Sequence, residues 1–208
     1  MKIFFYEINL VIFRAKSFIS FLSCEEQKRI VFYLDPKHQS LFIIRRGILR
    51  SLLGKYLEIP PKKVLIQIDS RGKPYTRDIF FNMSSSKEKL LIALSWEIPL
   101  GIDIEYTDVK NWSFDAEDFI FSENEKKMAS NLCSKARTEY FFTVWTKKES
   151  WVKATGSGLN MDLKSLDTEG SLQSHFTAFS VEKPYVAHLA VENNPLMNIS
   201  LDRKCFSV

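Results

Sequence analysis

One stretch of the sequence decides the fold around it: GIDIE, from Gly101 to Glu105. Its apolar residues Ile102 and Ile104 alternate with Asp103 and Glu105. Side chains on a strand change face at every residue, so this pattern predicts a strand that carries both carboxylates on one face.

A second stretch, WTKKESWVKATGSGL from Trp145 to Leu159, has the pattern of a helix. Apolar residues recur at helical spacing along the chain before it and within it, which predicts a helix from about Ala136 to Thr155. Gly156 stands where a left-handed residue would end that helix. On it, Glu149 and Lys153 are one turn apart.

Together the two stretches offer three carboxylates, Asp103, Glu105 and Glu149, and two lysines, Lys148 and Lys153. Mg²⁺ prefers oxygen ligands and fills its remaining positions with water or phosphate oxygens, so this set suits a magnesium ion held against a diphosphate. The lysines would neutralise phosphate charge. A general base would be a carboxylate such as Glu149, or a metal-bound water, because no histidine lies near either stretch: the three are His38, His175 and His188.

Each pattern taken singly also has a plain structural explanation. Asp-x-Glu at a strand end is commonly a solvated sheet face, and Glu149 with Lys153 is commonly a surface ion pair. A metal-dependent nuclease or a Mg²⁺-dependent phosphotransferase of another kind is an alternative. Nucleases of this sort place glutamate and lysine two apart on a strand, whereas here the two residues are four apart on a predicted helix.

The surrounding motifs make the chain resemble the phosphopantetheinyl transferases of the surfactin-synthetase-activating (Sfp) type. That family has a G-[IV]-D-[IVL]-E strand followed by a W-x-x-K-E-[AS]-x-x-K-x-x-G-x-G-L helix and turn, and both patterns match here without a gap. The resemblance spans about Ser23 to Leu163. Its further motifs are GKP (Gly72 to Pro74), FNMSSS (Phe81 to Ser86), FSENE (Phe121 to Glu125) and RRGILRSLLGKYL (Arg45 to Leu57).

The resemblance implies an enzyme that moves the phosphopantetheine arm of coenzyme A onto a serine of an apo acyl, peptidyl or aryl carrier protein. Adenosine 3',5'-bisphosphate would be released, and Mg²⁺ is the expected cofactor. A relative that binds coenzyme A or a carrier without turning it over is the alternative within this family. Neither nucleic acid nor a membrane is an expected partner, and a monomer is expected.

Matching positions carry the family's roles to this chain. Asp103, Glu105 and Glu149 correspond to the metal-binding carboxylates, with Glu149 as a candidate base, and Lys153 corresponds to the lysine that contacts the α-phosphate. Glu125 matches a further acidic position whose role stays open. The remaining candidate contacts to coenzyme A are Arg46, Lys73, Pro74, Ser84, Ser85 and Lys148.

Position 85 departs from the family, because Ser85 stands where the F-N-[IL]-S-H-S motif has histidine. Serine donates one hydrogen bond but carries no charge, which predicts weaker coenzyme A binding without loss of chemistry.

The expected fold class is α+β, with helices and short strands in each half of the chain. The resemblance implies two similar lobes related by a pseudo-twofold axis, each a small antiparallel sheet with packed helices, with the active site in the cleft between them. The expected division gives an N-terminal lobe of residues 1–99 and a C-terminal lobe of residues 100–208. Beyond the elements above, the patterns predict helices at 24–33, 39–57, 115–121 and 123–132 and strands at 2–13, 64–69, 90–96, 176–181 and 185–191.

Composition fits a folded protein of 208 residues with 45% hydrophobic content. Residues 1–100 carry a net charge of +8 and residues 101–208 a net charge of −4. A basic half beside an acidic half suits a site where phosphates meet one wall and a metal the other, although ordinary scatter of charges would look the same. Nucleic acid would satisfy the same electrostatics.

The N-terminal segment is apolar but interrupted by polar and charged residues, so neither a signal peptide nor a membrane span is expected. Three dispersed cysteines, Cys24, Cys133 and Cys205, indicate no disulfide framework. A cytoplasmic protein is therefore expected. Aromatic residues at Trp112, Phe114 and Phe119, in a segment that includes Asn111, suggest an exposed patch for the carrier protein.

Overall fold

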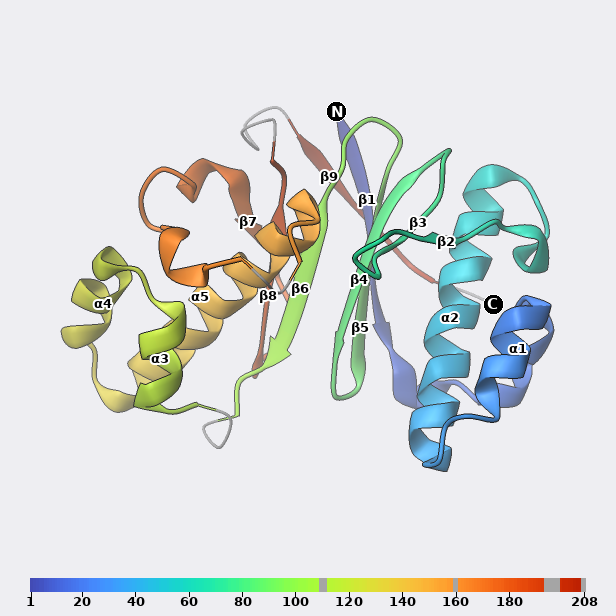
Figure 1. Cartoon of the computed structure of the whole chain (residues 1–208), viewed down its shortest axis with the longest axis horizontal. Helices are drawn as coiled ribbons and strands as arrows, with labels where there is room; N and C mark the ends of the chain where they lie inside the picture. Colours follow the sequence, from blue (N-terminus) through green and yellow to red (C-terminus); the bar gives the residue numbers. More distant parts are fainter. Residues whose placement is uncertain (109–111, 159–160, 193–198, 207–208) are drawn as a thin grey trace.

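The computed structural model describes residues 1–108, 112–158, 161–192 and 199–206. Its elements form four layers, with helices on the two outer sides and the two larger sheets between them (Figure 1); a third sheet in the described residues has two short strands, β2 and β3. The α-helices are α1 Cys24–Ile30, α2 Pro36–Leu57, α3 Phe114–Ile120, α4 Glu123–Ser130 and α5 Ser134–Thr155. The strands are β1 Lys2–Asn9, β2 Gln67–Ile68, β3 Pro74–Tyr75, β4 Phe80–Ser86, β5 Lys89–Ser95, β6 Gly101–Tyr106, β7 Phe176–Ala178, β8 Tyr185–Ala190 and β9 Ser200–Lys204.

The first sheet has the order β4-β5-β1-β9, with antiparallel pairing except between β1 and β9, which run parallel. Within this sheet β5 is buried on both faces. On one face, residues such as Tyr6, Ile92 and Leu94 pack against the apolar side of α2. On the other face, Ile3 and Leu91 pack against the second sheet.

The second sheet has the order β6-β8-β7 and is antiparallel throughout. Ile102 and Ile104 of β6 point toward the first sheet and help to form the apolar layer between the two sheets. The alternate residues of β6 therefore face the other way, toward α5. The predicted strand at GIDIE and the predicted shared face of Asp103 and Glu105 are confirmed.

The helix boundaries follow local capping rules. Ser23 and Glu26 form a capping box at the start of α1. The predicted start of α2 at position 39 is three residues late, because Asp35 caps the helix and Pro36 occupies its first position. Gly156 ends α5 in the left-handed conformation with φ 66°, which confirms the expected cap.

Mixed α and β structure with small sheets agrees with the predicted class, but several strands differ from the predictions. The opening strand ends at Asn9, whose side chain caps a 3₁₀ turn, Leu10–Ile12, and does not continue to position 13. The predicted strand at 64–69 is only Gln67–Ile68. β9 was not predicted, and it joins the first sheet beside β1, so the chain crosses back over the expected division at residue 99.

The short connections include further 3₁₀ turns and a cis peptide bond. These turns are η2 Ala15–Ser17, η3 Ile19–Phe21, η4 Pro61–Lys63, η6 Leu163–Ser165 and η7 Gln173–His175. The peptide bond between Lys183 and Pro184 is cis.

Candidate active site

The site begins where β6 crosses α5. Gly101 opens β6, and a Cβ atom there would overlap the backbone of Ser150 and Ala154 on the helix. Because Gly101 has no side chain, the strand can lie directly on α5. That close approach places the carboxylate face of β6 beside Glu149 and Lys153.

Asp103 lies at the centre of the site, with only 2% of its surface exposed. Its Oδ1 atom accepts hydrogen bonds from Lys153 Nζ at 2.5 Å and from Ser84 Oγ at 2.7 Å. Its Oδ2 atom is buried and has no hydrogen-bond partner. Burial raises the pKa of Asp103, and Lys153 opposes that rise. The site therefore contains a buried carboxylate oxygen, Asp103 Oδ2, that accepts no hydrogen bond.

The other two carboxylates of the site belong to Glu105 and Glu149. Glu149 Oε2 lies 4.0 Å from Lys153 Nζ. Burial raises the pKa of both glutamates, and the charge of Asp103 raises it further in each case. The three carboxylates thus repel one another electrostatically, and the ammonium group of Lys153 offsets part of that repulsion. As they stand, no three acidic, histidine or cysteine side chains in the described part of the chain are gathered tightly enough to count as a metal cluster.

A pocket of about 350 Å³ adjoins these residues. The GKP turn forms one wall with Lys73 and Pro74, and α5 forms another with Glu149 and Lys153. Lys73 Nζ donates to the backbone carbonyl of Lys153. In the same way, Arg71 donates to the carbonyl of Gly156. Two cations from the turn therefore bind carbonyl groups at the end of α5, where no intrahelical donor remains.

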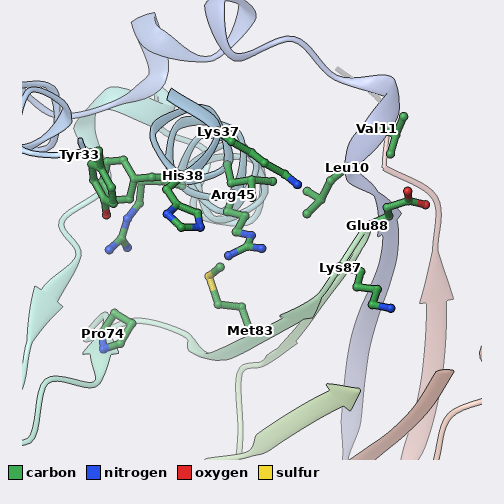
Figure 2. Close-up of a pocket in the computed structure, with 13 residues that line it drawn as sticks. Leu10, Val11, Tyr33, Lys37, His38, Arg45, Pro74, Met83, Lys87 and Glu88 are labelled. Carbon is green, nitrogen blue, oxygen red and sulfur yellow. The ribbon is translucent and has the colours of Figure 1, made fainter. Parts of the chain in front are cut away.

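A second, larger pocket of about 920 Å³ shares Pro74 and Met83 with the first. Figure 2 shows Arg45 and His38 projecting from α2 toward Met83 of β4. Arg46 also lines this pocket, and it forms an ion pair with Glu26 at 3.1 Å.

Two guanidinium nitrogens in the larger pocket, Arg45 Nε and Arg46 Nη1, are buried without a hydrogen-bond partner. Burial lowers the pKa of both arginines. A pocket with buried cations and unused donors suits an anionic ligand. Ser85 has the same facing as Met83, because residues two apart on a strand share a face. Position 85 therefore lies on the face of β4 that carries Met83, although Ser85 itself does not line the pocket.

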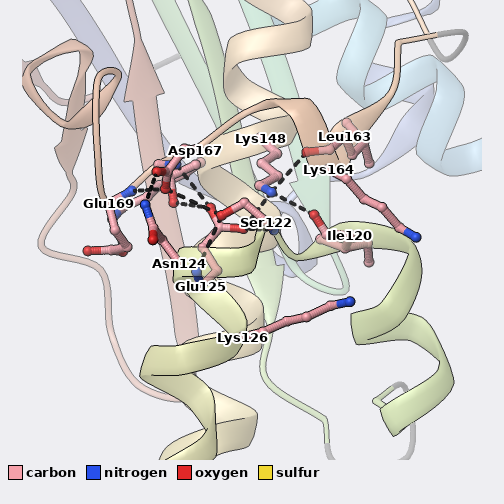
Figure 3. A network of polar contacts seen from close by, with 12 residues as sticks. Ile120, Ser122, Asn124, Glu125, Lys126, Lys148, Leu163, Lys164, Asp167 and Glu169 are labelled. Carbon is pink, nitrogen blue, oxygen red and sulfur yellow. Dashed lines mark hydrogen bonds and ion pairs between the residues drawn. The ribbon is translucent and has the colours of Figure 1, made fainter.

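Lys148 does not lie with the other predicted site residues, and this placement does not favour its predicted role as a phosphate contact. Its side chain is completely buried, with its ammonium group bonded to Glu125 Oε2 at 2.5 Å. The same group also donates to the carbonyl oxygens of Ile120 and Leu163 (Figure 3). All three of its N–H donors are thus used within the protein.

Glu125, whose role the sequence left open, is the centre of this buried network. Besides Lys148, it accepts a hydrogen bond from the backbone of Ser122 at 2.7 Å (Figure 3). It also accepts hydrogen bonds from the backbone and side chain of Thr168 at 3.0 and 2.8 Å. The network ties the start of α4 and the segment after η6 to α5. The FSENE motif indicates the part of this network at the start of α4, because its Ser122 and Glu125 form a capping box.

Two polar residues of β4 that contact β6 were not identified from the sequence. Asn82 accepts a hydrogen bond from the backbone of Ile102, and Ser86 donates to Glu105. The alternation of polar residues in FNMSSS was the available signal, because positions 82, 84 and 86 share one face of β4.

The proposed aromatic patch is only partly exposed. Phe119 has 74% of its surface exposed. The Trp112 side chain is half-buried, and its indole nitrogen donates to Glu117 at 2.9 Å. Phe114 begins α3, and Asn111 lies outside the described residues.

The segment that carries the site residues of β6 and α5 is similar to known proteins. Residues 99–199, which contain β6 and α5, match the model of the 4'-phosphopantetheinyl transferase superfamily. The chain is 35% identical over 144 residues to the 4'-phosphopantetheinyl transferase HetI of Nostoc sp.. The chain belongs to the 4'-phosphopantetheinyl transferase superfamily. The resemblance seen in its motifs is therefore confirmed.

Two further relatives in this superfamily support the assignment. The transferase gsp of Aneurinibacillus migulanus is 34% identical over 163 residues, which cover 76% of this chain and 65% of that protein. Sfp of Bacillus subtilis is 30% identical over 156 residues, or 71% of this chain and 66% of that one. The HetI alignment covers 66% of this chain and 61% of HetI. The chain thus spans roughly three fifths to two thirds of the length of these transferases.

Two other observations bear on the expectations from composition. Among the described residues, no helix is long and apolar enough to cross a membrane. The three cysteines are free and exposed.

Proposed function

We propose that this chain transfers the 4'-phosphopantetheine arm of coenzyme A to a serine hydroxyl of an apo carrier protein. One observation carries the proposal: Glu149 and Lys153 of α5 meet Asp103 of β6 beside a pocket lined by Lys73 and Pro74. These residues come from three distant segments, and each segment holds one of the superfamily's motifs. Membership in the superfamily supports the same reaction.

The reaction is a displacement at phosphorus. The serine oxygen would attack the phosphorus that bears the pantetheine arm, and the bond from that phosphorus to the bridging oxygen would break. Adenosine 3',5'-bisphosphate would leave. Glu149 would accept the serine proton, and its raised pKa makes it a stronger base than an exposed glutamate. Lys153 would balance the charge that develops on the leaving α-phosphate.

Asp103, Glu105 and Glu149 would hold Mg²⁺. Two observations fit this assignment: the donor set consists of carboxylates, which Mg²⁺ prefers, and Asp103 Oδ2 is a buried acceptor without a partner. When bound, the ion would neutralise charge on the diphosphate. Lys153 now supplies the positive charge nearest Asp103, so it would turn toward the α-phosphate when both ligands are present.

The two pockets, which share Pro74 and Met83, would divide coenzyme A between them. The diphosphate would lie beside Lys73 and Lys153 in the smaller pocket. The phosphorylated nucleoside would lie in the larger pocket, where Arg45 and Arg46 have unused donors. Ser85, which replaces the family's histidine, lies on the face of β4 that carries Met83. Ser84 would contact the coenzyme from the strand between the pockets. We further propose that the chain has two pseudo-twofold lobes with this site in their cleft, acts as a cytoplasmic monomer and binds neither nucleic acid nor membranes.

The carrier protein would approach from the side of α3, which lies in the segment between β6 and α4. Phe119 supports this part of the proposal, because it is a large apolar side chain with 74% of its surface exposed. A Phe119→Ala variant should raise the KM for the carrier and leave the KM for coenzyme A unchanged. An unchanged KM for the carrier would reject this docking surface.

Intact mass spectrometry tests the activity itself. An apo carrier protein is incubated with the chain, coenzyme A and Mg²⁺, and a Glu149→Gln variant is run alongside. We expect the carrier to gain the mass of one phosphopantetheine arm, and we expect the variant to abolish that gain. If several carriers show no gain with folded protein, calorimetric titration of coenzyme A decides whether the chain binds it without turnover.

A further inference from the structure

Three polar side chains of β4 point toward β6, although the two strands belong to different sheets. They are Asn82, Ser84 and Ser86, which alternate along the strand and so share a face. We call these three side chains the β4–β6 bridge. β4 lies at the edge of the first sheet and β6 at the edge of the second, so the bridge joins the two sheets where no backbone pairing does.

At one end of the bridge, Ser86 makes two hydrogen bonds to β6. Its hydroxyl donates to Glu105 Oε2 at 2.8 Å and accepts from the backbone N–H of Tyr106 at 3.0 Å. A serine hydroxyl has one donor, so the backbone bond leaves its proton directed at the carboxylate. Ser86 therefore fixes the orientation of Glu105 relative to its own strand.

The other two members act in the same way on the neighbouring part of β6. Ser84 donates to Asp103 Oδ1 at 2.7 Å and accepts from Lys153 Nζ at 3.2 Å. Asn82 Oδ1 accepts from the backbone N–H of Ile102 at 3.0 Å, in a buried setting. The bridge thus sets the register of β6 against β4 and holds two acidic side chains in defined orientations.

We propose that Ser86 is a positioning residue for Glu105 and that the β4–β6 bridge keeps the two carboxylates of β6 ready to bind a divalent cation. The cation itself rests on the proposed function. Ser86 would touch neither substrate nor metal and would act through Glu105 alone. Partners of this kind, which hold a ligating group in place, commonly change metal affinity by 10–100-fold when they are removed.

The test measures Mn²⁺ binding, with no carrier protein present. Free Mn²⁺ is followed by electron paramagnetic resonance during titration, with and without coenzyme A, for the wild type, Ser86→Ala and Ser86→Thr. Threonine keeps the hydroxyl and suits a strand. Ser200→Ala is the matched control, because Ser200 is an exposed serine on β9, far along the first sheet from β4. Thermal unfolding establishes that each variant is folded.

We expect Ser86→Ala to weaken Mn²⁺ binding by about tenfold. Ser86→Thr should stay within about twofold of the wild type, and Ser200→Ala should have no effect. Equal affinity of Ser86→Ala and the wild type would overturn the proposal. Equal losses in Ser86→Ala and Ser86→Thr would also overturn it, because the hydroxyl would then not be the cause. If Ser86→Ala does not fold, Ser86→Cys, which keeps a similar volume with a weaker donor, takes its place.

The outcomes separate this inference from the proposed function. Phosphopantetheine transfer by the wild type together with unaltered Mn²⁺ binding by Ser86→Ala would reject the inference alone. The expected order of Mn²⁺ affinities without any transfer would support the inference and reject the transferase. No Mn²⁺ binding by the wild type under either condition would overturn the positioning role.

Discussion

Replacing Lys148 by methionine would remove one half of the buried ion pair with Glu125. Methionine fills a similar volume, so the main loss is electrostatic. Glu125 would keep its hydrogen bonds from Ser122 and Thr168, but its charge would be buried without a cation. Removing one partner of such a pair costs about 3–5 kcal/mol. The carbonyl groups of Ile120 and Leu163 would also lose their donor.

The free energy of unfolding should therefore fall by about 4 kcal/mol, within the range for a broken buried pair. For a chain of this length, that loss corresponds to a decrease in melting temperature of about 8–16 °C. Urea unfolding followed by tryptophan fluorescence measures the change. Lys147→Met is the matched control, because the adjacent pair of Lys147 with Glu169 at 2.9 Å is partly exposed and should contribute about 0–1 kcal/mol.

The same variant also separates a structural role for Lys148 from a role in phosphate binding. If the ammonium group serves only the buried network, the folded variant assayed at low temperature should keep the KM of the wild type for coenzyme A. A Lys148→Met protein that unfolds like the wild type but shows a much higher KM would refute the reasoning. A Glu125→Gln/Lys148→Met double variant should lose less stability than the two single losses combined, since neutral groups need no counter-charge.

Three further predictions follow from single contacts. Gly101→Ala should abolish close packing of β6 on α5 and lower the melting temperature, because the added Cβ meets backbone atoms of Ser150; an unchanged melting temperature would contradict the contact. Burial and the nearby charge of Lys147 lower the pKa of His188 to about 3 from an ordinary value of 6.5. The unfolded chain then binds more protons between these two values, so stability is complete above pH 6.5 and should fall as pH decreases below it. Urea unfolding at pH 7.5 and pH 5 should show this loss in the wild type and a smaller one in His188→Gln. Ser85→His should lower the KM for coenzyme A, and an unchanged KM would refute the prediction of weakened binding at this position.

The local elements could be predicted because their signals are local. Alternation in GIDIE, the capping box at Ser23 and the glycine at position 156 each depend on residues within one turn or one strand. Local signals could not predict that Asp103 and Lys153 lie beside each other, because nothing within either stretch fixes the distance between β6 and α5. The family resemblance supplied that link, and Gly101 supplies its physical reason.

Lys148 shows that matching a motif does not by itself place every residue of that motif at one site. It stands next to Glu149 in the sequence, but neighbouring positions on a helix point about 100° apart. Glu149 turns toward β6, so Lys148 turns toward α4 and meets the carboxylate of Glu125. Helical geometry predicts that Lys148 and Glu149 point in different directions. The identity of the partner of Lys148, Glu125, depends on how α4 packs against α5.

β9 illustrates the opposite limit, where the decisive contact lies almost 200 residues away. Ser200 to Lys204 carries three charged residues in five and lacks the apolar run of a central strand. It forms a strand because β1 offers an open edge, and its charges are matched by that neighbour: Asp202 pairs with Lys2 at 2.9 Å, and Arg203 pairs with Glu7. A polar strand suits the outer edge of a sheet, because charged side chains there discourage pairing with another chain. β9 thus protects one edge of the sheet, and at the other edge the side chains of β4 contact the carboxylates of β6.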